Sequence, residues 1–249
     1  MREVCIVKRY GDRYKLIFIT SKRIPGYEEV LDEWELFCRK HGRKIKGTCK
    51  LENNIARARS RIYEIAMCNE WSHFITGTLD GSKYDRYNLS AFQKDLTIFI
   101  RNQRKDAKAP NLKYLIIPEQ HKDGAWHFHG LLNGLNPSML SEFGPDVPKK
   151  IRSQYRNYRA YSKKFGFCSV GEIKNQEAVA AYITKYISKD MAKTNIGLGN
   201  HLYYCSLGLN RAEIIKQGKL VTSPTYWDYE NEYAKVKWIQ KEDIDKYII

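Results

Sequence analysis

The sequence predicts an α+β fold in which antiparallel β-strands are combined with packed α-helices. Three observations support this class: segments in which alternate residues are apolar, segments with apolar residues at helical spacing, and an Asp123-Gly124 turn between two strand-like segments. The length of 249 residues suits one large domain or a domain with an elaboration. Hydrophobic residues at 43% and aromatic residues at 13% exclude a mainly disordered chain.

The expected strands are short runs of apolar and β-branched residues bounded by turn residues. In the run 72–80, for example, Phe74 and Thr76 fall on one face and Ile75 falls on the other. The two runs on either side of the Asp-Gly turn are expected to pair as antiparallel neighbours. The strands are expected at residues 4–7, 14–19, 72–80, 112–118, 125–133 and 167–173.

The expected helices carry apolar residues three and four positions apart. Phe92 and Leu96, for example, share one face of the helix expected at 89–103. Residues 134–148 contain repeated Gly and Pro and are expected to form a loop. The topology after residue 201 stays open. The other helices are expected at 27–40, at 51–68, and from 175 or 176 to 189.

The charge of the chain indicates a polyanionic partner. Lys and Arg number 43 against 28 Asp and Glu, which gives a formal net charge of +15 and a pI near 9.4. Nucleic acid and an acidic membrane surface both fit this excess. No window approaches about 18 consecutive apolar residues, so a membrane span is not expected. The N-terminus lacks the apolar stretch of a signal peptide, which favours a cytoplasmic location.

One strand of the expected hairpin carries two histidines that face the same way. His127 and His129 are two residues apart, so their side chains share a face of the strand, and Phe128 points to the other. Glu119 comes just before the turn on the neighbouring strand, where it can meet the imidazoles. Two nitrogens and one carboxylate oxygen form a three-ligand site for a divalent metal with positions left open. The alternative is a pair of histidines bonded to backbone or solvent.

The end of the last expected helix carries tyrosines and lysines in a repeated pattern. Tyr182 and Tyr186 are four residues apart and share one helix face, and Lys185 and Lys189 repeat that spacing. A tyrosine phenol has a pKa of ~10, so it needs a nearby cation or metal to act as a nucleophile. The alternative is an amphipathic helix whose tyrosines only pack.

Basic residues gather in two segments that are candidates for DNA contact. Residues 149–164 interleave basic side chains with tyrosines, a composition that can neutralise phosphates and stack on bases. The helix expected at 51–68 carries three closely spaced arginines. For both segments the alternative is a solvated helix face. The candidates are Arg57, Arg59, Arg61, Arg152, Arg156, Arg159, Tyr155 and Tyr158.

Three motifs stand in a fixed order: the strand 74–80, then Glu119 with His127-Phe128-His129, then Tyr182-x-x-Lys185-Tyr186-x-x-Lys189. In this order they resemble the signature of the HUH endonucleases that initiate rolling-circle replication. The doubled tyrosines resemble the two-tyrosine initiator (Rep) proteins of small phages and plasmids. The resemblance covers about residues 70–190. It implies a central antiparallel sheet of about five strands, similar to an RNA-recognition motif, with helices packed outside it.

The resemblance implies site- and strand-specific nicking of single-stranded DNA at a replication origin, in linear or hairpin form, and rejoining at termination. A tyrosine oxygen would attack a phosphodiester and give a 5′-phosphotyrosine link and a free 3′-OH. A host helicase and polymerase, in a bacterial cytoplasm, are the implied protein partners. The implied catalytic residues are Tyr182, Tyr186, Lys185 and Lys189, and the implied ligands of Mg²⁺ or Mn²⁺ are Glu119, His127 and His129.

The same resemblance suggests how the chain is organised. Residues 71–192 would form the nuclease core, residues 1–70 an accessory hairpin with helices packed on it, and residues 193–249 a C-terminal extension. Gly77 stands where the first motif often has a bulkier residue, which indicates a structural role. The segment from Tyr186 on also resembles single-tyrosine initiators, in which Tyr186 alone would be the nucleophile.

Other functions fit parts of the pattern. A relaxase usually places its tyrosine before the histidines, and a transposase of this superfamily usually carries one tyrosine. A non-catalytic nucleic-acid-binding protein would bind DNA without metal and without a covalent adduct. A metal-dependent hydrolase that uses only Glu119, His127 and His129 would keep its activity after both tyrosines are replaced.

Overall fold

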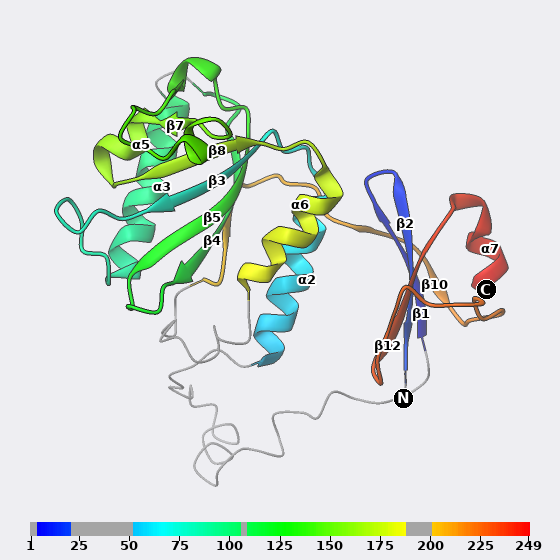
Figure 1. The fold of residues 1–249 in the computed structure, drawn as a ribbon. Helices are drawn as coiled ribbons and strands as arrows, with labels where there is room; N and C mark the ends of the chain where they lie inside the picture. The colour runs from blue at the N-terminus through cyan, green and yellow to red at the C-terminus, as the bar shows by residue number, and fades with distance from the viewer. Residues whose placement is uncertain (1–3, 21–51, 106–108, 188–200) are drawn as a thin grey trace, which may run out of the picture. The chain divides into compact units, whose positions relative to one another are not determined.

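The computed structural model describes residues 4–20, 52–105, 109–187 and 201–249, and the helix expected at 27–40 lies outside them. The chain divides into two compact units, one of residues 48–209 and one of residues 1–47 with 210–249 (Figure 1). Within the described residues, each unit is built around a five-stranded antiparallel sheet. The predicted α+β class and antiparallel pairing are confirmed.

The sheet of the unit 48–209 has the strand order β8-β3-β5-β4-β9. Its strands are β3 (His73–Thr78), β4 (Lys113–Gln120), β5 (Trp126–Asn133), β8 (Cys168–Glu172) and β9 (Tyr204–Cys205). The predicted hairpin is β4–β5, and Glu119 lies inside β4, directly opposite His127 of β5. Gly124 in the connecting turn has a φ of 85°, a conformation that favours glycine.

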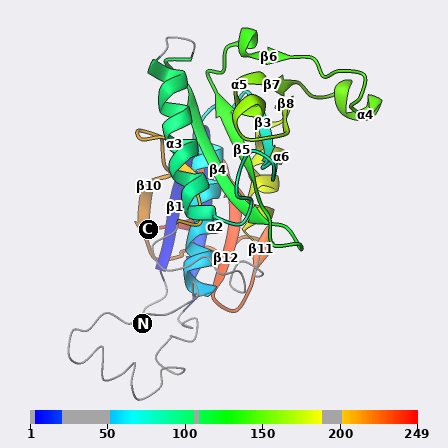
Figure 2. The ribbon, with the colours of Figure 1, turned by 90° about the vertical axis from the view of Figure 1, so that its left-hand side faces the viewer.

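Helices lie on both sides of this sheet (Figures 1 and 2). On one side, α3 (Leu89–Lys105) packs against Phe128 of β5, whose ring stacks on Phe92 at a centroid distance of 6.0 Å. On the other side lie α2 (Glu52–Cys68) and α6 (Gln176–Ile183). Gln176 joins these two helices by donating to the carbonyls of Ala66 and Asn69, both at 2.9 Å. The alternation of β5 therefore sends Phe128 into one core and the two histidines to the α6 side.

The tyrosine helix is shorter than the sequence predicts. The α-helix α6 begins after Asn175, whose side chain caps the Ala178 N–H, and it ends at Ile183. A 3₁₀ turn, η3 (Thr184–Tyr186), follows. The Thr184 hydroxyl donates to the Ala181 carbonyl at 2.7 Å, a local bond that competes with the helical ladder. Lys189 lies outside the described residues.

The segment 134–164 winds beside β8 rather than forming one loop and one helix. Its backbone is tied to β8, because the N–H and carbonyl of Arg156 bond to the carbonyl and N–H of Val170, both at 2.8 Å. Its elements are η2 (Pro137–Met139), β6 (Leu140–Ser141), α4 (Lys149–Arg152), β7 (Asn157–Tyr158) and α5 (Arg159–Lys164).

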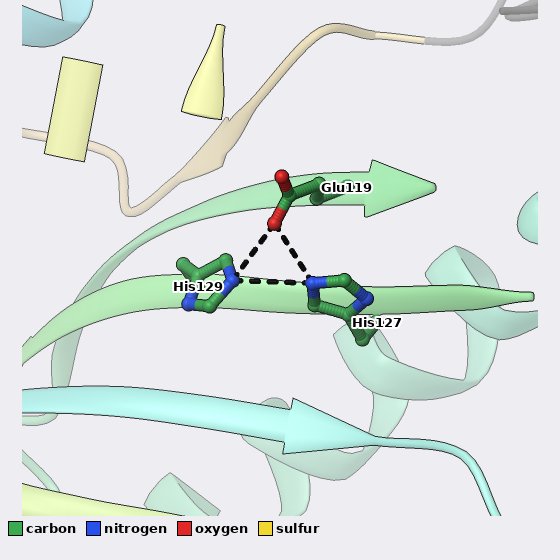
Figure 3. Close-up of side chains that lie close together, drawn as sticks. All are labelled: Glu119, His127 and His129. Carbon is green, nitrogen blue, oxygen red and sulfur yellow. Dashed lines mark hydrogen bonds and ion pairs between the residues drawn. The ribbon is translucent and has the colours of Figure 1, made fainter. Parts of the chain in front are cut away.

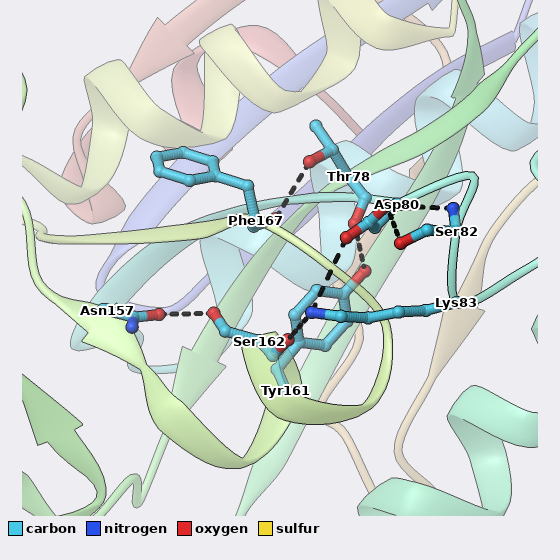
Figure 4. Close-up of polar contacts among 8 residues, drawn as sticks. All are labelled: Thr78, Asp80, Ser82, Lys83, Asn157, Tyr161, Ser162 and Phe167. Atoms are coloured by element: carbon cyan, nitrogen blue, oxygen red, sulfur yellow. Dashed lines mark hydrogen bonds and ion pairs between the residues drawn. The ribbon is translucent and has the colours of Figure 1, made fainter. Parts of the chain in front are cut away.

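Polar contacts fasten α5 to the end of β3 (Figure 4). The Tyr161 hydroxyl donates to the Thr78 carbonyl at 3.3 Å, and Lys83 donates to the Ser162 carbonyl at 3.3 Å. Lys83 also lies 3.6 Å from the Asp80 carboxylate. The first motif therefore fixes the position of the basic segment that follows the hairpin.

Gly77 is required because the Phe128 ring occupies the space of a side chain. A Cβ at this position would lie 2.4 Å from Phe128 Cε1 and 2.9 Å from Tyr161 Cζ. We expect Gly77→Val to lower the free energy of unfolding by about 1–3 kcal/mol, measured by urea denaturation, since both rings are buried and must move. The double variant Gly77→Val/Phe128→Leu should recover part of the loss, and equal stability of Gly77→Val and the parent would contradict this packing.

The second unit joins the two ends of the chain. The hairpin β1 (Val4–Tyr10) and β2 (Arg13–Ile19) was expected from sequence and is confirmed, with Gly11 at a φ of 60° in its turn. The strand order is β10-β1-β2-β12-β11, and Cys5, Val7 and Leu16 form the core with the C-terminal helix. The remaining elements are β10 (Glu213–Gly218), β11 (Tyr229–Glu230), β12 (Ala234–Ile239), η5 (Lys241–Asp243) and α7 (Ile244–Tyr247).

The two units divide the chain differently from the three segments expected at 1–70, 71–192 and 193–249. The helix α2 falls in the same unit as the central motifs because it packs on α6, and β9 falls there because it pairs with β4. These pairings join residues far apart in sequence, which local periodicity does not report.

Candidate metal centre and tyrosine pair

Glu119, His127 and His129 converge on one point above the β4–β5 hairpin (Figure 3). Oε2 of Glu119 lies 2.8 Å from Nε2 of His127 and 2.9 Å from Nε2 of His129, and the two nitrogens are 3.2 Å apart. Both imidazoles are buried, at 8% and 9% exposure. The meeting of the three side chains predicted from sequence is confirmed.

The protonation states at this site suit a divalent cation. Burial by itself raises the pKa of Glu119, but the hydrogen bonds and charges of His127 and His129 outweigh it and lower the pKa to about 2. Burial lowers the pKa of His129, against the opposing effect of Glu119. At neutral pH the site therefore offers an ionised carboxylate and a neutral imidazole. This mixed N/O donor set fits Mn²⁺ well and Mg²⁺ less closely.

The depressed pKa of Glu119 also makes a statement about stability. A carboxyl group whose pKa is lower in the folded state stabilises the fold above its unfolded pKa of ~4.3. That contribution is lost as the pH falls from there towards about 2. In metal-free protein the triad therefore stabilises this hairpin at neutral pH.

Thr76 orients His129 from the neighbouring strand. Its Oγ1 lies 3.0 Å from Nδ1 of His129, directly across the β3–β5 pairing. In the tautomer that leaves Nε2 free for a metal, Nδ1–H donates to this hydroxyl. Sequence reasoning missed this role, although the placement of Thr76 opposite the histidine follows from the antiparallel register.

Replacing this hydroxyl should weaken metal binding. We expect Thr76→Val to raise the Kd for Mn²⁺ by about tenfold, because partners of this kind typically change metal affinity by about 10- to 100-fold. Titration followed by the electron paramagnetic resonance of free Mn²⁺ measures the change. Thr78→Val is the matched control, since its hydroxyl donates to the Phe167 carbonyl at 3.0 Å instead. An unchanged Kd in Thr76→Val would show that the hydroxyl does not orient the ligand.

The two tyrosines lie against this centre. The Tyr186 ring stacks on the His129 imidazole, with centroids 3.6 Å apart and planes inclined by 15°. The Tyr186 hydroxyl donates to the Tyr182 hydroxyl at 2.7 Å. Phe74 of β3 contacts all three rings, at centroid distances of 5.6 to 6.4 Å. The pair predicted from the four-residue spacing therefore faces the candidate metal ligands.

The environment of Tyr186 opposes a free phenolate. Burial raises its pKa, and the hydrogen bond to Tyr182 and the negative charge of Glu119 raise it further. Lys185 is exposed, and its Nζ lies 5.4 Å from the centre of the Tyr182 ring. Arg59 of α2 donates to the carbonyl of Ile187, directly after the 3₁₀ turn, and so anchors the tyrosine segment.

The tyrosines open into a groove of about 550 Å³. Thr76 and His129 form part of its wall, and so does Tyr155 from the basic segment. Tyr155 is half-buried. A second cavity of about 590 Å³ adjoins it and shares Tyr155, Glu172 and Lys174.

The structure places the DNA-contact candidates in different settings. Tyr158 is only 3% exposed and packs on Phe99, and its hydroxyl donates to Gln103 at 3.1 Å. The prediction that it stacks on a base is therefore wrong, because β7 turns this side chain into the core. Arg57 and Arg152 are exposed, and Arg159 donates to the Ser138 carbonyl at 3.0 Å.

Three further arginines have partners. Arg59 is used by the carbonyl of Ile187, Arg61 lies 3.7 Å from Glu64, and Arg156 lies 3.8 Å from Glu142. Arg156 also lines the second cavity. Of the eight candidates named from sequence, Tyr155 and Arg156 are the two that line the cavities beside the site.

Fold and site together define an α+β protein with a candidate divalent-metal centre faced by two tyrosines. Residues 72–191 match the family model of the replication-associated protein ORF2 and its relatives. The matched segment is just under half of the chain and contains β3, the β4–β5 hairpin and both tyrosines. The match supports a replication initiator of the Rep type, with a role in DNA replication and in DNA binding. No curated protein and no solved structure matches the chain.

None of the helices that the structure describes has the length and apolarity needed to cross a membrane.

Proposed function

We propose that this protein initiates rolling-circle replication by metal-dependent nicking of single-stranded origin DNA, and that it rejoins the strand at termination. The observation that carries the proposal is the stacking of Tyr186 on His129 at 3.6 Å, which puts a nucleophile beside the metal ligands. The match of residues 72–191 to a replication-associated family supports it. The two-tyrosine HUH architecture is part of the same proposal.

Tyr186 is the proposed first nucleophile. Its Oη attacks the scissile phosphorus, the Oη–P bond forms, and the bond from phosphorus to the 3′ oxygen breaks. The phenolic proton is given up and the leaving 3′ oxygen is protonated, so one proton moves in net terms from Tyr186 to a free 3′-OH. The 5′-phosphate stays on the tyrosine, which conserves the energy of the phosphodiester for rejoining.

The protein's own charges explain why a cation is needed. Burial and Glu119 both disfavour a negative charge on Tyr186. A divalent cation bound by Glu119, His127 and His129 would supply positive charge to the scissile phosphate and to the developing phenolate. Lys185, which is exposed beside Tyr182, would add positive charge at the phosphate. Lys189 is proposed for the same role on sequence grounds alone.

The second tyrosine allows a second transfer without release of the first strand. Tyr182 Oη contacts Tyr186 Oη at 2.7 Å, so a phosphate that reaches one hydroxyl lies close to the other. Tyr182 can therefore attack a second strand while Tyr186 still holds the first. Unwinding and synthesis would be left to a host helicase and polymerase.

A covalent adduct assay tests this function. The full-length protein is mixed with Mn²⁺ or Mg²⁺ and tiled single-stranded oligonucleotides that cover its own replicon. The label is placed at the 3′ end, so that it stays on the fragment linked to tyrosine. We expect a labelled protein band on a denaturing gel with one tile, and its loss in EDTA. No band with any tile, or a band that persists in EDTA, would contradict the proposal.

A further inference from the structure

A second cavity lies beside the tyrosine groove and has a different character. It is lined by His73 and Glu172, with Gln154, Tyr155, Arg156 and Lys174 around them. Tyr155 and Glu172 also line the tyrosine groove, so the two spaces adjoin. None of the residues proposed as metal ligands or nucleophiles lines this cavity. A DNA strand that passes the tyrosines therefore meets a further recess with its own set of polar groups.

Tyr155 forms the divider between the two spaces and is held in place from both sides. The paired backbone bonds between Arg156 and Val170 at 2.8 Å fix the chain beside β8. The Tyr155 ring lies against Gly171, where an added Cβ would be 2.9 Å from its Cε1 atom. The glycine therefore lets the ring lie close to the β8 backbone. A half-buried aromatic ring in such a position offers a stacking surface to an unpaired base.

Glu172 decides which part of a nucleotide can enter. It is exposed on β8, directly opposite His73 of β3. A carboxylate repels a phosphate but accepts hydrogen bonds from the amino groups of bases. Lys174 and Arg156 in the same lining can meet the phosphates on either side of that base. The charges thus suit a base inside the cavity and the backbone at its rim.

We propose that this cavity binds one unstacked base next to the scissile phosphate, with Tyr155 stacked on its face and Glu172 accepting from its exocyclic amino group. The inference rests on the proposed function, since it takes the DNA strand to run past the tyrosines. Cytosine, adenine and guanine carry such an amino group, and thymine does not. The pocket therefore selects against thymine at one position beside the nick.

Binding in the absence of chemistry tests this pocket. Fluorescein-labelled dC12 and dT12 are titrated with the full chain carrying Tyr182→Phe/Tyr186→Phe, at one fixed salt concentration, and anisotropy gives each Kd. We expect dC12 to bind about tenfold more tightly than dT12, as one base contact of this type supplies. Adding Glu172→Gln should bring the two Kd values together, because an amide donates to thymine as readily as it accepts from cytosine.

Three further variants separate the stacking from the readout. Tyr155→Phe should keep both affinities and Tyr155→Ala should weaken both by about tenfold, because stacking needs only the ring. The control Glu70→Gln changes an exposed carboxylate outside the cavity and should leave the ratio unchanged.

The outcomes distinguish this pocket from the nicking activity. Equal Kd values for dC12 and dT12 in the parent, or a ratio that survives Glu172→Gln, would overturn the base pocket even if covalent adducts form. A ratio that depends on Glu172 would support the pocket even if no adduct is ever found, and then the nicking proposal alone would fail.

Discussion

The variant His127→Ala/His129→Ala is expected to form the covalent DNA adduct about 10³-fold more slowly than the parent protein. It removes two of the three side chains that converge within 2.8 to 3.2 Å of one another. Without the bound cation, nothing in this group offsets the charge on the phosphate and on Tyr186. The rate of appearance of the labelled band, with Mn²⁺ and saturating oligonucleotide, measures the loss.

Two controls accompany the histidine variant. His201→Ala removes an exposed histidine outside the triad and should leave the rate unchanged. The more conservative Glu119→Gln keeps the size of the third ligand but removes its charge, and should also slow the reaction strongly. A histidine variant that remains folded and nicks at the rate of the parent would show that the triad is not the metal site.

The variant Tyr182→Phe/Tyr186→Phe is expected to form no covalent adduct while it binds single-stranded DNA within about twofold of the parent. Phenylalanine keeps the ring that stacks on His129, so packing is preserved and only the nucleophilic oxygens are lost. Denaturing gels measure the adduct and fluorescence anisotropy measures the binding. A double variant that still cleaves DNA would favour a metal-dependent hydrolase instead.

The single variants assign the order of attack. Tyr186→Phe should lose the first nick, since this ring is the one against the metal ligands. Tyr182→Phe should keep the first nick and lose the transfer of the strand to a second acceptor. Equal loss of the first nick in both single variants would show that the two hydroxyls act as one unit, as their 2.7 Å contact allows.

The metal centre was predictable because it depends on local rules. A two-residue alternation puts His127 and His129 on one face, and an Asp-Gly turn sets an antiparallel register that brings Glu119 opposite His127. The four-residue spacing of Tyr182 and Tyr186 likewise survives the change from α-helix to 3₁₀ turn, because both residues stay on the same side. Short-range periodicity was therefore enough for the residues that carry the chemistry.

The parts that sequence reasoning missed depend on contacts between distant segments. Tyr158 was expected on the surface, but it lies in the core because β7 packs it on Phe99 of α3. The seat of Tyr155 depends on Gly171 of β8, and nothing near either residue in sequence indicates that contact. The pairing of β1 with β10 joins residues about 200 positions apart. Composition and periodicity cannot report such pairings.

Peptide mapping of the adduct tests the central claim most directly, because Lys185 separates the two tyrosines. Trypsin cuts after Lys174, Lys185 and Lys189, so Tyr182 falls in peptide 175–185 and Tyr186 in peptide 186–189. After nuclease trimming of the bound DNA, mass spectrometry locates the residual nucleotide. We predict that the first turnover leaves a 5′-phosphonucleotide on peptide 186–189. A nucleotide on a peptide that contains neither tyrosine would contradict tyrosine-mediated nicking by this pair.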